Sequence, residues 1–381
     1  MVSVCFFILF FAYCRHKKTL VVKFSCEVNL NTRDFSMLPY MRNPHERSLF
    51  IYMQDNFNKE LENNQLEILS DKDVKGKERP WRDKKMKTIP LAESYKRLGI
   101  KKYYRVRDCG DYLEFKKFSD NTLKLNKANF CKVRLCPMCS WRREKKTFTQ
   151  VSKVMDKALE EKEYRFLFLT LTCKNVLGSD LLDTLNDLFH SFKKFTERKK
   201  IKSAIKGWFR ALEITHNLDV DSKDYDTYHP HFHVILMVNK SYFNDPNYYI
   251  SQEEWTSLWK QSMKVDYTPI VNIKVFKTGT KKEVAKSVSE SAKYTVKDND
   301  YIVVGDEEMT DSAVMILDKA LENRRLIAFG GELKKIHKQL SFDDAIDGDL
   351  IHRNDDEIRE DIEFIIQGYK WHIGYKQYFK L

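Results

Sequence analysis

The chain has 381 residues, and its 67 lysines and arginines outnumber 55 acidic residues to give a net charge of +12 at pH 7. This length is enough to bury a full hydrophobic core, and the 25 phenylalanines and 19 tyrosines exclude an intrinsically disordered protein. The excess of positive charge favours a polyanionic partner such as nucleic acid, although a soluble basic protein without such a partner has the same balance.

The first residues form a short apolar run, MVSVCFFILFFAYC, followed by RHKK. This run is too short for a comfortable membrane-spanning helix. Its positive charges follow it, whereas a secretory signal peptide carries them in front. We interpret the run as an extension outside the fold, with Met37 and Met41 as alternative translation starts, and a membrane anchor as the less favoured alternative. Since no other segment resembles a span, we expect a cytoplasmic protein without stable membrane association.

Residues 37–90 are polar and highly charged and show little periodicity. They are typical of a linker or a loosely ordered arm that touches DNA phosphates, and equally of a solvated coil. We therefore expect residues 1–97 to be a poorly structured extension.

A cysteine-rich stretch follows, with the spacing C-x21-C-x4-C-x2-C formed by Cys109, Cys131, Cys136 and Cys139. The Cys-Pro-Met-Cys step is a tight knuckle that can aim two thiolates at one ion. Clustered cysteines in a reducing cytoplasm favour a tetrahedral structural zinc site, with Cys109 as the candidate fourth ligand, over disulfides. Buried cysteines without a metal are the alternative.

The knuckle runs directly into four basic residues, which are Arg142, Arg143, Lys145 and Lys146. We expect them to present a basic face to a DNA backbone. Residues 98–146 are therefore predicted to form a small, zinc-ribbon-like unit.

Alternating helices and strands are predicted next. A helix over 145–161 leads to the sequence RFLFLTLT at 165–172, which is typical of a central strand. Apolar residues at helical spacing predict a helix over 180–199. In the following strand, GWFRALEITHN, Glu213 stands between Leu212 and Ile214. A buried carboxylate is costly unless it is paired or coordinates a metal, and an edge-strand salt bridge is the alternative.

The segment HPHFHVILMV at 229–238 predicts a buried strand with two histidines on one face, because alternate side chains of a strand point the same way. Two strands joined by a short connection normally pair, which would bring Glu213 beside His231 and His233. Such a site suits Mg²⁺ or Mn²⁺, and its imidazoles favour Mn²⁺. His229 competes with Glu213 as third ligand, and a pair of ordinary core or surface histidines is the alternative.

A helix is predicted over 281–297, with Glu290, Tyr294 and Lys297 on the side opposite its apolar residues. Positive charge from Lys297 and a metal would favour the phenolate of Tyr294. That phenolate could attack a phosphodiester and form a covalent phosphotyrosine, while Glu290 activates water or a 3′-hydroxyl. A solvated face is the alternative. Tyr301 is a second candidate nucleophile, but residues 298–300 are expected to end the helix before it.

The order of these segments resembles a known family. FLTLT, the HPHFHV core and ESAKYTVK occur in this order, after the cysteine-rich FCKVRLCPMCSWRR and before ALENRRLIAFGGELKK. Over residues 98–381 the chain resembles the rolling-circle replication initiators of small Gram-positive plasmids, a branch of the HUH endonuclease superfamily.

The resemblance implies an α+β fold in which a central antiparallel sheet with flanking helices follows the zinc-binding unit. We expect the catalytic domain over 147–305 and a C-terminal α/β region over 306–381. The resemblance also implies a site- and strand-specific nick at the plasmid's double-strand origin. His231 and His233 would be metal ligands and Tyr294 the nucleophile bound to the 5′-phosphate, while Glu290 would promote hydrolysis at termination. The freed 3′-hydroxyl would prime a host polymerase, and a host helicase is an implied partner.

Two other classes of protein are considered. A mobilisation relaxase or a single-strand transposase belongs to the same superfamily, but the cysteine cluster upstream of the first motif argues against both. A zinc-dependent DNA-binding regulator without catalysis would leave Glu213, His231 and Tyr294 unexplained.

Overall fold

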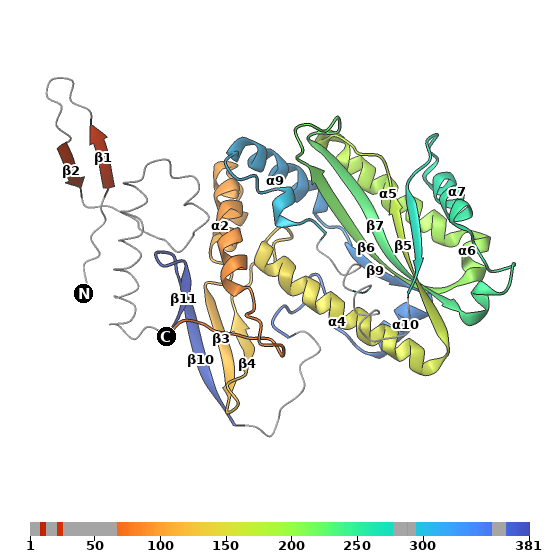
Figure 1. Cartoon of the computed structure of the whole chain (residues 1–381), viewed down its shortest axis with the longest axis horizontal. Coiled ribbons are helices and arrows are strands. Elements are labelled where there is room, and N and C mark those ends of the chain that lie inside the picture. Colours follow the sequence, from red (N-terminus) through yellow and green to blue (C-terminus); the bar gives the residue numbers. More distant parts are fainter. Residues whose placement is uncertain (1–7, 13–20, 26–66, 277–287, 289–294, 353–362) are drawn as a thin grey trace. The chain divides into compact units, whose positions relative to one another are not determined.

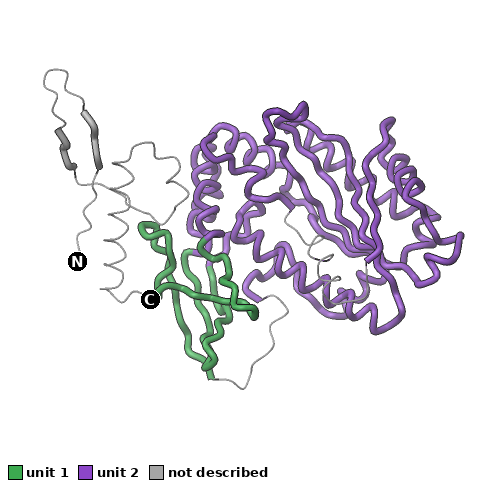
Figure 2. Tube along the Cα trace, in the orientation of Figure 1, with its two compact units in different colours: residues 1–82, 111–128, 362–381 green, residues 83–110, 129–361 purple. Residues whose placement is uncertain are grey.

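Helices and antiparallel sheets alternate along the part of the chain that the computed structural model describes, which is residues 8–12, 21–25, 67–276, 288, 295–352 and 363–381 (Figure 1). The fold is thus α+β, as expected. The chain divides into two units, the first made of residues 1–82, 111–128 and 362–381 and the second of residues 83–110 and 129–361 (Figure 2). Strands β1 (Ile8–Ala12) and β2 (Val21–Ser25) pair as an antiparallel hairpin.

The first unit contains a four-stranded antiparallel sheet. Its order is β11 (Gln377–Lys380), β10 (Phe364–His372), β3 (Tyr112–Phe118) and β4 (Leu123–Ala128). Phe115 on β3 is the centre of its aromatic core, 5.8 Å from the ring of Trp81 and 5.9 Å from that of Tyr369. Because β3 pairs with β10 from the far end of the chain, this sheet takes strands from both the expected cysteine-rich unit and the expected C-terminal region.

Helix α2 (Trp81–Arg97) lies partly where we expected poorly structured chain, and α3 (Lys102–Arg107) follows it. Although α2 is rich in charged residues, one of its faces is apolar, and Leu91, Ala92 and Tyr95 on this face are buried. Polar tertiary contacts fix the helix against α9 (Glu307–Leu321), because the Tyr95 hydroxyl donates to Asp318 at 2.8 Å and Arg97 pairs with Asp311 at 2.8 Å. The prediction of an unstructured extension was therefore wrong for this stretch.

The second unit is built on a five-stranded antiparallel sheet. Its order is β8 (Val271–Val275), β5 (Tyr164–Thr172), β7 (Thr227–Asn239), β6 (Ile205–Asn217) and β9 (Ile327–Gly330). The strands predicted from the RFLFLTLT, GWFRALEITHN and HPHFHVILMV segments are confirmed as β5, β6 and β7, and the histidine strand is central.

Helices cover both faces of this sheet (Figure 1). On one face α4 (Pro137–Glu161) and α10 (Gly331–Gln339) enclose a core that includes Phe166, Phe209, Ile235 and Met237. The opposite face is covered by α5 (Leu181–Glu197), α6 (Lys199–Ala204) and α7 (Gln252–Met263). There Phe192 of α5 packs edge-on against Trp208 and Phe232. The apolar spacing predicted for a helix over 180–199 is therefore confirmed by α5.

Three short 3-10 turns complete the second unit, namely η2 (Gly178–Asp180), η3 (Lys240–Phe243) and η4 (Asp298–Asp300). Among the described residues, no helix is long and apolar enough to cross a bilayer.

Two stretches of chain line the outer edge of β6: Leu326 with strand β9, and Thr295. Strand β9 pairs with residues 208–211 of β6. The backbone N–H of Leu212 donates to the Leu326 carbonyl at 2.9 Å, and the N–H of Ile214 donates to the Thr295 carbonyl at 2.7 Å. Thr295 is thereby fixed beside the strand position that follows Glu213.

Candidate functional site

Glu213 and two histidines meet on the face of the second unit's sheet. In the register of β6 and β7, Glu213 stands opposite His231, and Ala211 opposite His233. The Nε2 atom of His233 lies 2.7 Å from Oε2 of Glu213, and that of His231 lies 3.5 Å from the same oxygen. The predicted pairing of these two strands is confirmed, and it brings the three side chains together.

Contacts on the far side of each ring turn its Nε2 atom toward Glu213. The Nδ1 atom of His231 donates to the His229 carbonyl at 3.1 Å. The Nδ1 atom of His233 lies 3.5 Å from the Thr170 hydroxyl, and this ring stacks on Phe168 with 5.4 Å between centroids. Such contacts fix the orientation and tautomer of an imidazole and are typical of histidines that bind metals.

The carboxylate of Glu213 is buried, with 8% of its side chain exposed. Burial alone would raise its pKa, but hydrogen bonds and charge from His231 and His233 outweigh this and hold the pKa well below its usual range. The other carboxylate oxygen lies 3.0 Å from the ammonium group of Lys297. Glu213 therefore remains ionised and is shared between two imidazoles and a cation.

These three residues fit a divalent cation. Their ligand atoms all lie within 4.8 Å of one another, and neighbouring ligands about 2.1 Å from an octahedral ion are about 3 Å apart. One carboxylate oxygen and two imidazole nitrogens form a donor set suited to divalent first-row metals and leave coordination positions for another ligand. Glu213, His231 and His233 could thus hold a metal ion.

The structure groups Glu213 rather than His229 with His231 and His233. His229 stands opposite Thr215 in the strand register. Its ring centroid lies 5.3 Å from that of His231, and burial lowers its pKa. Its Nε2 atom is buried and makes no hydrogen bond within the described part of the chain.

The predicted nucleophile helix is described only in part. Tyr294 and Glu290 lie outside the described residues, whereas Lys297 immediately precedes η4 and reaches Glu213. Tyr301, the alternative nucleophile, is buried, and its hydroxyl donates to the carbonyl of Leu135. This tyrosine is therefore part of the packed core.

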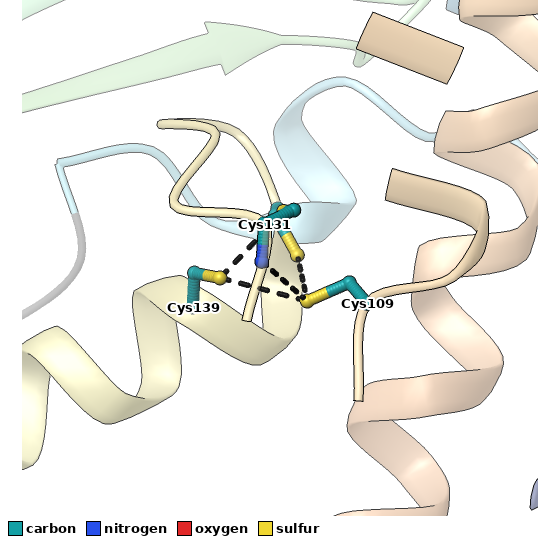
Figure 3. A group of neighbouring side chains, drawn as sticks. Cys109, Cys131 and Cys139 are labelled. Carbon is teal, nitrogen blue, oxygen red and sulfur yellow. Dashed lines mark hydrogen bonds between the residues drawn. The ribbon is translucent and has the colours of Figure 1, made fainter. Parts of the chain in front are cut away.

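Four cysteines form a second candidate metal site, and Figure 3 shows three of them, Cys109, Cys131 and Cys139. The Sγ atom of Cys109 lies 3.6 Å from those of Cys136 and Cys139, and Cys131 lies 3.6 Å from Cys139. Four sulfurs bound tetrahedrally at about 2.3 Å from zinc are about 3.8 Å apart. All four side chains are buried, so the predicted fourth cysteine joins a closed set that could hold a metal ion.

Backbone groups around the cluster favour thiolates. The N–H groups of Lys132 and Val133 donate to Cys139 at 3.3 Å and to Cys131 at 3.4 Å, and Lys132 adopts a left-handed conformation with φ of 58°. Burial raises the pKa of Cys139, but hydrogen bonds from the other thiols and the charge of Arg143 outweigh it and lower that pKa. A hydrogen bond with Cys131 raises the pKa of Cys109, and burial raises that of Cys136. The backbone N–H groups therefore favour negative charge on the sulfurs that they contact, those of Cys131 and Cys139.

The basic residues after the knuckle do not form the expected basic face. Arg142, Arg143 and Lys146 are buried, and only Lys145 is exposed. Arg142 donates to the carbonyls of Leu350 and Ile351, and Arg143 to those of Ile346, Val133 and Lys132. Lys146 donates to Asp343 and to the Asp349 carbonyl. The expectation of DNA contacts is corrected for these three, because their charges hold the 343–351 segment against α4.

Comparison with known proteins gives consistent matches. A family described as "Replication protein" matches residues 122–379. A "Protein rep" of Bacillus amyloliquefaciens is 43% identical over 342 residues, which cover 83% of this chain and 98% of that protein. Proteins of the same name from Streptococcus pneumoniae and Lactiplantibacillus plantarum are 41% and 38% identical, covering 77% and 82% of this chain and 89% and 99% of their own lengths. No solved structure matches significantly. The resemblance drawn from the ordered motifs is thus confirmed, and the chain belongs to the replication protein (Rep) family of plasmid replication initiators.

Proposed function

We propose that this protein starts plasmid replication by cutting one strand of the double-strand origin with Tyr294, which becomes joined to the 5′-phosphate. The observation that carries this proposal is the cluster of Glu213, His231 and His233 on the sheet. A divalent cation held there would neutralise and orient the phosphate that is cut. The imidazole ligands favour Mn²⁺ over Mg²⁺.

The backbone beside the cluster supports Tyr294 as the nucleophile. Thr295, the next residue, accepts a hydrogen bond from Ile214 at 2.7 Å, and Ile214 follows the ligand Glu213 in β6. Thr295, the residue that follows Tyr294 in the sequence, is thus held beside the strand that supplies a metal ligand. The burial of Tyr301 argues against that alternative.

Lys297 would help to form the attacking phenolate. Its ammonium group is held by Glu213 at 3.0 Å, and a cation next to a phenol lowers the phenol's pKa. The Tyr294 oxygen would bond to phosphorus while the 3′-oxygen leaves and takes up a proton, so that one phosphodiester replaces another and the step is reversible. Glu290 would activate water or a 3′-hydroxyl at termination.

The remaining parts fit the same function. We infer that the cluster of Cys109, Cys131, Cys136 and Cys139 holds structural zinc, because four buried sulfurs leave no open coordination position. A central antiparallel sheet with the histidine strand in the middle suits an HUH-like nuclease. The partners would be origin DNA, a host helicase and a host polymerase that extends the 3′-hydroxyl.

The test is to incubate the protein with Mn²⁺ and supercoiled DNA that carries its origin, and then to run a denaturing gel. We expect nicked DNA with protein attached to its 5′ end. Tyr294→Phe should lose both products while it still binds DNA, and the matched Tyr301→Phe variant should keep both. Tight binding without a nick, across metals and origin sequences, would instead indicate a DNA-binding regulator.

A further inference from the structure

A groove with several cations lies between β9 and α10 of the second unit. Its cavity has a volume of about 490 Å³, within the range of pockets that hold a small organic ligand. Arg325 lines it just before β9, Phe329 lies on that strand, and α10 contributes Lys334, His337 and Lys338. We call these five residues the β9–α10 groove.

Three cations of the groove are available to a ligand. Arg325, Lys334 and Lys338 are exposed, and no carboxylate of the described residues lies within ion-pair distance of them. The acidic residues on the wall are Asp344 and Asp347, and the second already pairs with Arg134 at 3.3 Å. The groove therefore retains a net positive charge that favours an anionic ligand.

The groove also contains an aromatic surface. The ring of Phe329 stacks on that of His337 with 4.5 Å between centroids, and both residues are partly exposed. Phe329 also packs against Phe209 of the core with 4.9 Å between ring centroids, which fixes the ring in place. Cations beside a fixed aromatic surface are typical of sites for single-stranded nucleic acid, where phosphates meet the cations and bases stack on the rings.

Strand β9, which forms one wall of the groove, pairs with β6, the strand that carries Glu213. The backbone of β6 pairs with β9 up to Ala211. Beyond it, Leu212 donates a hydrogen bond to Leu326, and Ile214 donates one to Thr295. Arg325 immediately precedes Leu326, so the cationic groove begins next to the part of β6 that carries Glu213. A strand held at the metal centre could therefore run directly into the groove.

We propose that the β9–α10 groove binds single-stranded DNA next to the phosphate that is cut. This inference rests on the proposed nicking function, which defines the phosphate that is cut. Binding of the single strand can nevertheless be measured without catalysis. The groove is large enough for one nucleotide whose base is turned out of the base stack. A single strand can present such a base, whereas the bases of a duplex remain stacked and paired.

The test uses the full chain in the Tyr294→Phe background, without added divalent metal, and follows the fluorescence anisotropy of a labelled single strand of about 20 nucleotides. The triple variant Arg325→Ala/Lys334→Ala/Lys338→Ala removes the three cations. Loss of three phosphate contacts should weaken binding at least about tenfold and reduce the slope of log affinity against log salt by about 2. Unchanged affinity and slope would overturn the proposal, as would a loss confined to duplex DNA.

A matched control removes the same charge elsewhere. Lys193, Lys199 and Lys202 are exposed on α5 and α6, which cover the other face of the sheet, and their triple alanine variant should keep the affinity and the slope. Phe329→Leu keeps an apolar contact with Phe209, so it should fold normally and yet bind the single strand more weakly. An equal loss in the lysine control would show non-specific attraction and refute the groove.

The outcomes separate this inference from the proposed function. Groove-dependent binding by a protein that never nicks its origin would refute the nicking function and leave the groove standing. A protein that nicks through Tyr294 but binds single strands equally well without the groove cations would refute the groove alone.

Discussion

The two candidate metal sites of the second unit differ in the number of their donor atoms and in how deeply these are buried. The cysteine cluster has four buried sulfur donors with neighbours at 3.6 Å. The sheet site has three donors, and each histidine leaves 13% of its side chain exposed. A complete, buried ligand set stabilises structure, whereas an incomplete set leaves positions for a substrate. We therefore expect the cysteine cluster to contribute to stability and the sheet site to contribute to the chemistry.

The groups next to the two sites also differ, since those beside the cysteines hold the fold and the one beside Glu213 is exposed. Backbone N–H groups and the buried Arg143 surround the cysteines, and all of them also hold the local fold. Beside Glu213 stands Lys297, whose side chain is 47% exposed and which can act on a bound group.

The largest expected effect is on stability at the closed site. Cys136→Ser should release the metal and lower the free energy of unfolding by more than about 4 kcal/mol, because the metal's binding energy contributes to folding. Metal content per chain and thermal unfolding would be measured together. Cys173→Ser, a buried cysteine outside the cluster, should keep the metal. An unchanged metal content in the Cys136 variant would show that the cluster does not bind one.

At the open site, His231→Ala should reduce the nicking rate by about 10³-fold, which corresponds to about 4 kcal/mol of lost transition-state stabilisation. Added Mn²⁺ should not restore the rate, and thermal unfolding should change little because the imidazole is partly exposed. His229→Ala is the control, since His229 lies outside the ligand group. Full activity of the His231 variant would contradict the assignment of the metal centre.

Arg143→Leu tests whether the basic residues after the knuckle serve structure. Its guanidinium donates to three backbone carbonyls, so we expect a loss of about 2–3 kcal/mol in the free energy of unfolding. DNA affinity and its salt dependence, measured on the folded variant, should be normal. Lys145→Leu should leave stability unchanged. The reverse pattern, with stability kept and the salt dependence reduced, would restore the original expectation of a DNA-binding face.

The smallest effect is expected at Lys297. Lys297→Met should slow nicking about tenfold, because the phenol loses a nearby cation. A phenol with a higher pKa ionises only at higher pH, so the rise of the nicking rate with pH should also move upward. Lys297→Arg should keep most of the rate. A profile that does not move in the Met variant would exclude this role.

The sheet site could be predicted because its signals are local. A carboxylate between Leu212 and Ile214 and histidines two residues apart are visible in the sequence, and the short link between their strands indicates the pairing. The choice between Glu213 and His229 required the actual strand register, which puts Glu213 opposite His231.

Other features of the fold could not be predicted, because no local sequence pattern indicates them. Arg142, Arg143 and Lys146 were expected on the surface because charged side chains are seldom buried. Each of them donates to at least one backbone carbonyl some 200 residues away in sequence. Helix α2 was missed because ion pairs of Arg97 with Asp311 and Glu307 of α9 support it. The pairing of β3 with β10 depends on contacts between distant segments, and no local pattern predicts such a pairing.

The most direct test is to locate the phosphate after the reaction. Origin DNA would be nicked in Mn²⁺ and digested with nuclease, and the peptide that carries the remaining nucleotide would be sequenced by tandem mass spectrometry. The account predicts a 5′-linked nucleotide on Tyr294 in the wild type and no adduct in Glu213→Ala. A nucleotide on another residue, or nicked DNA without any adduct, would contradict it.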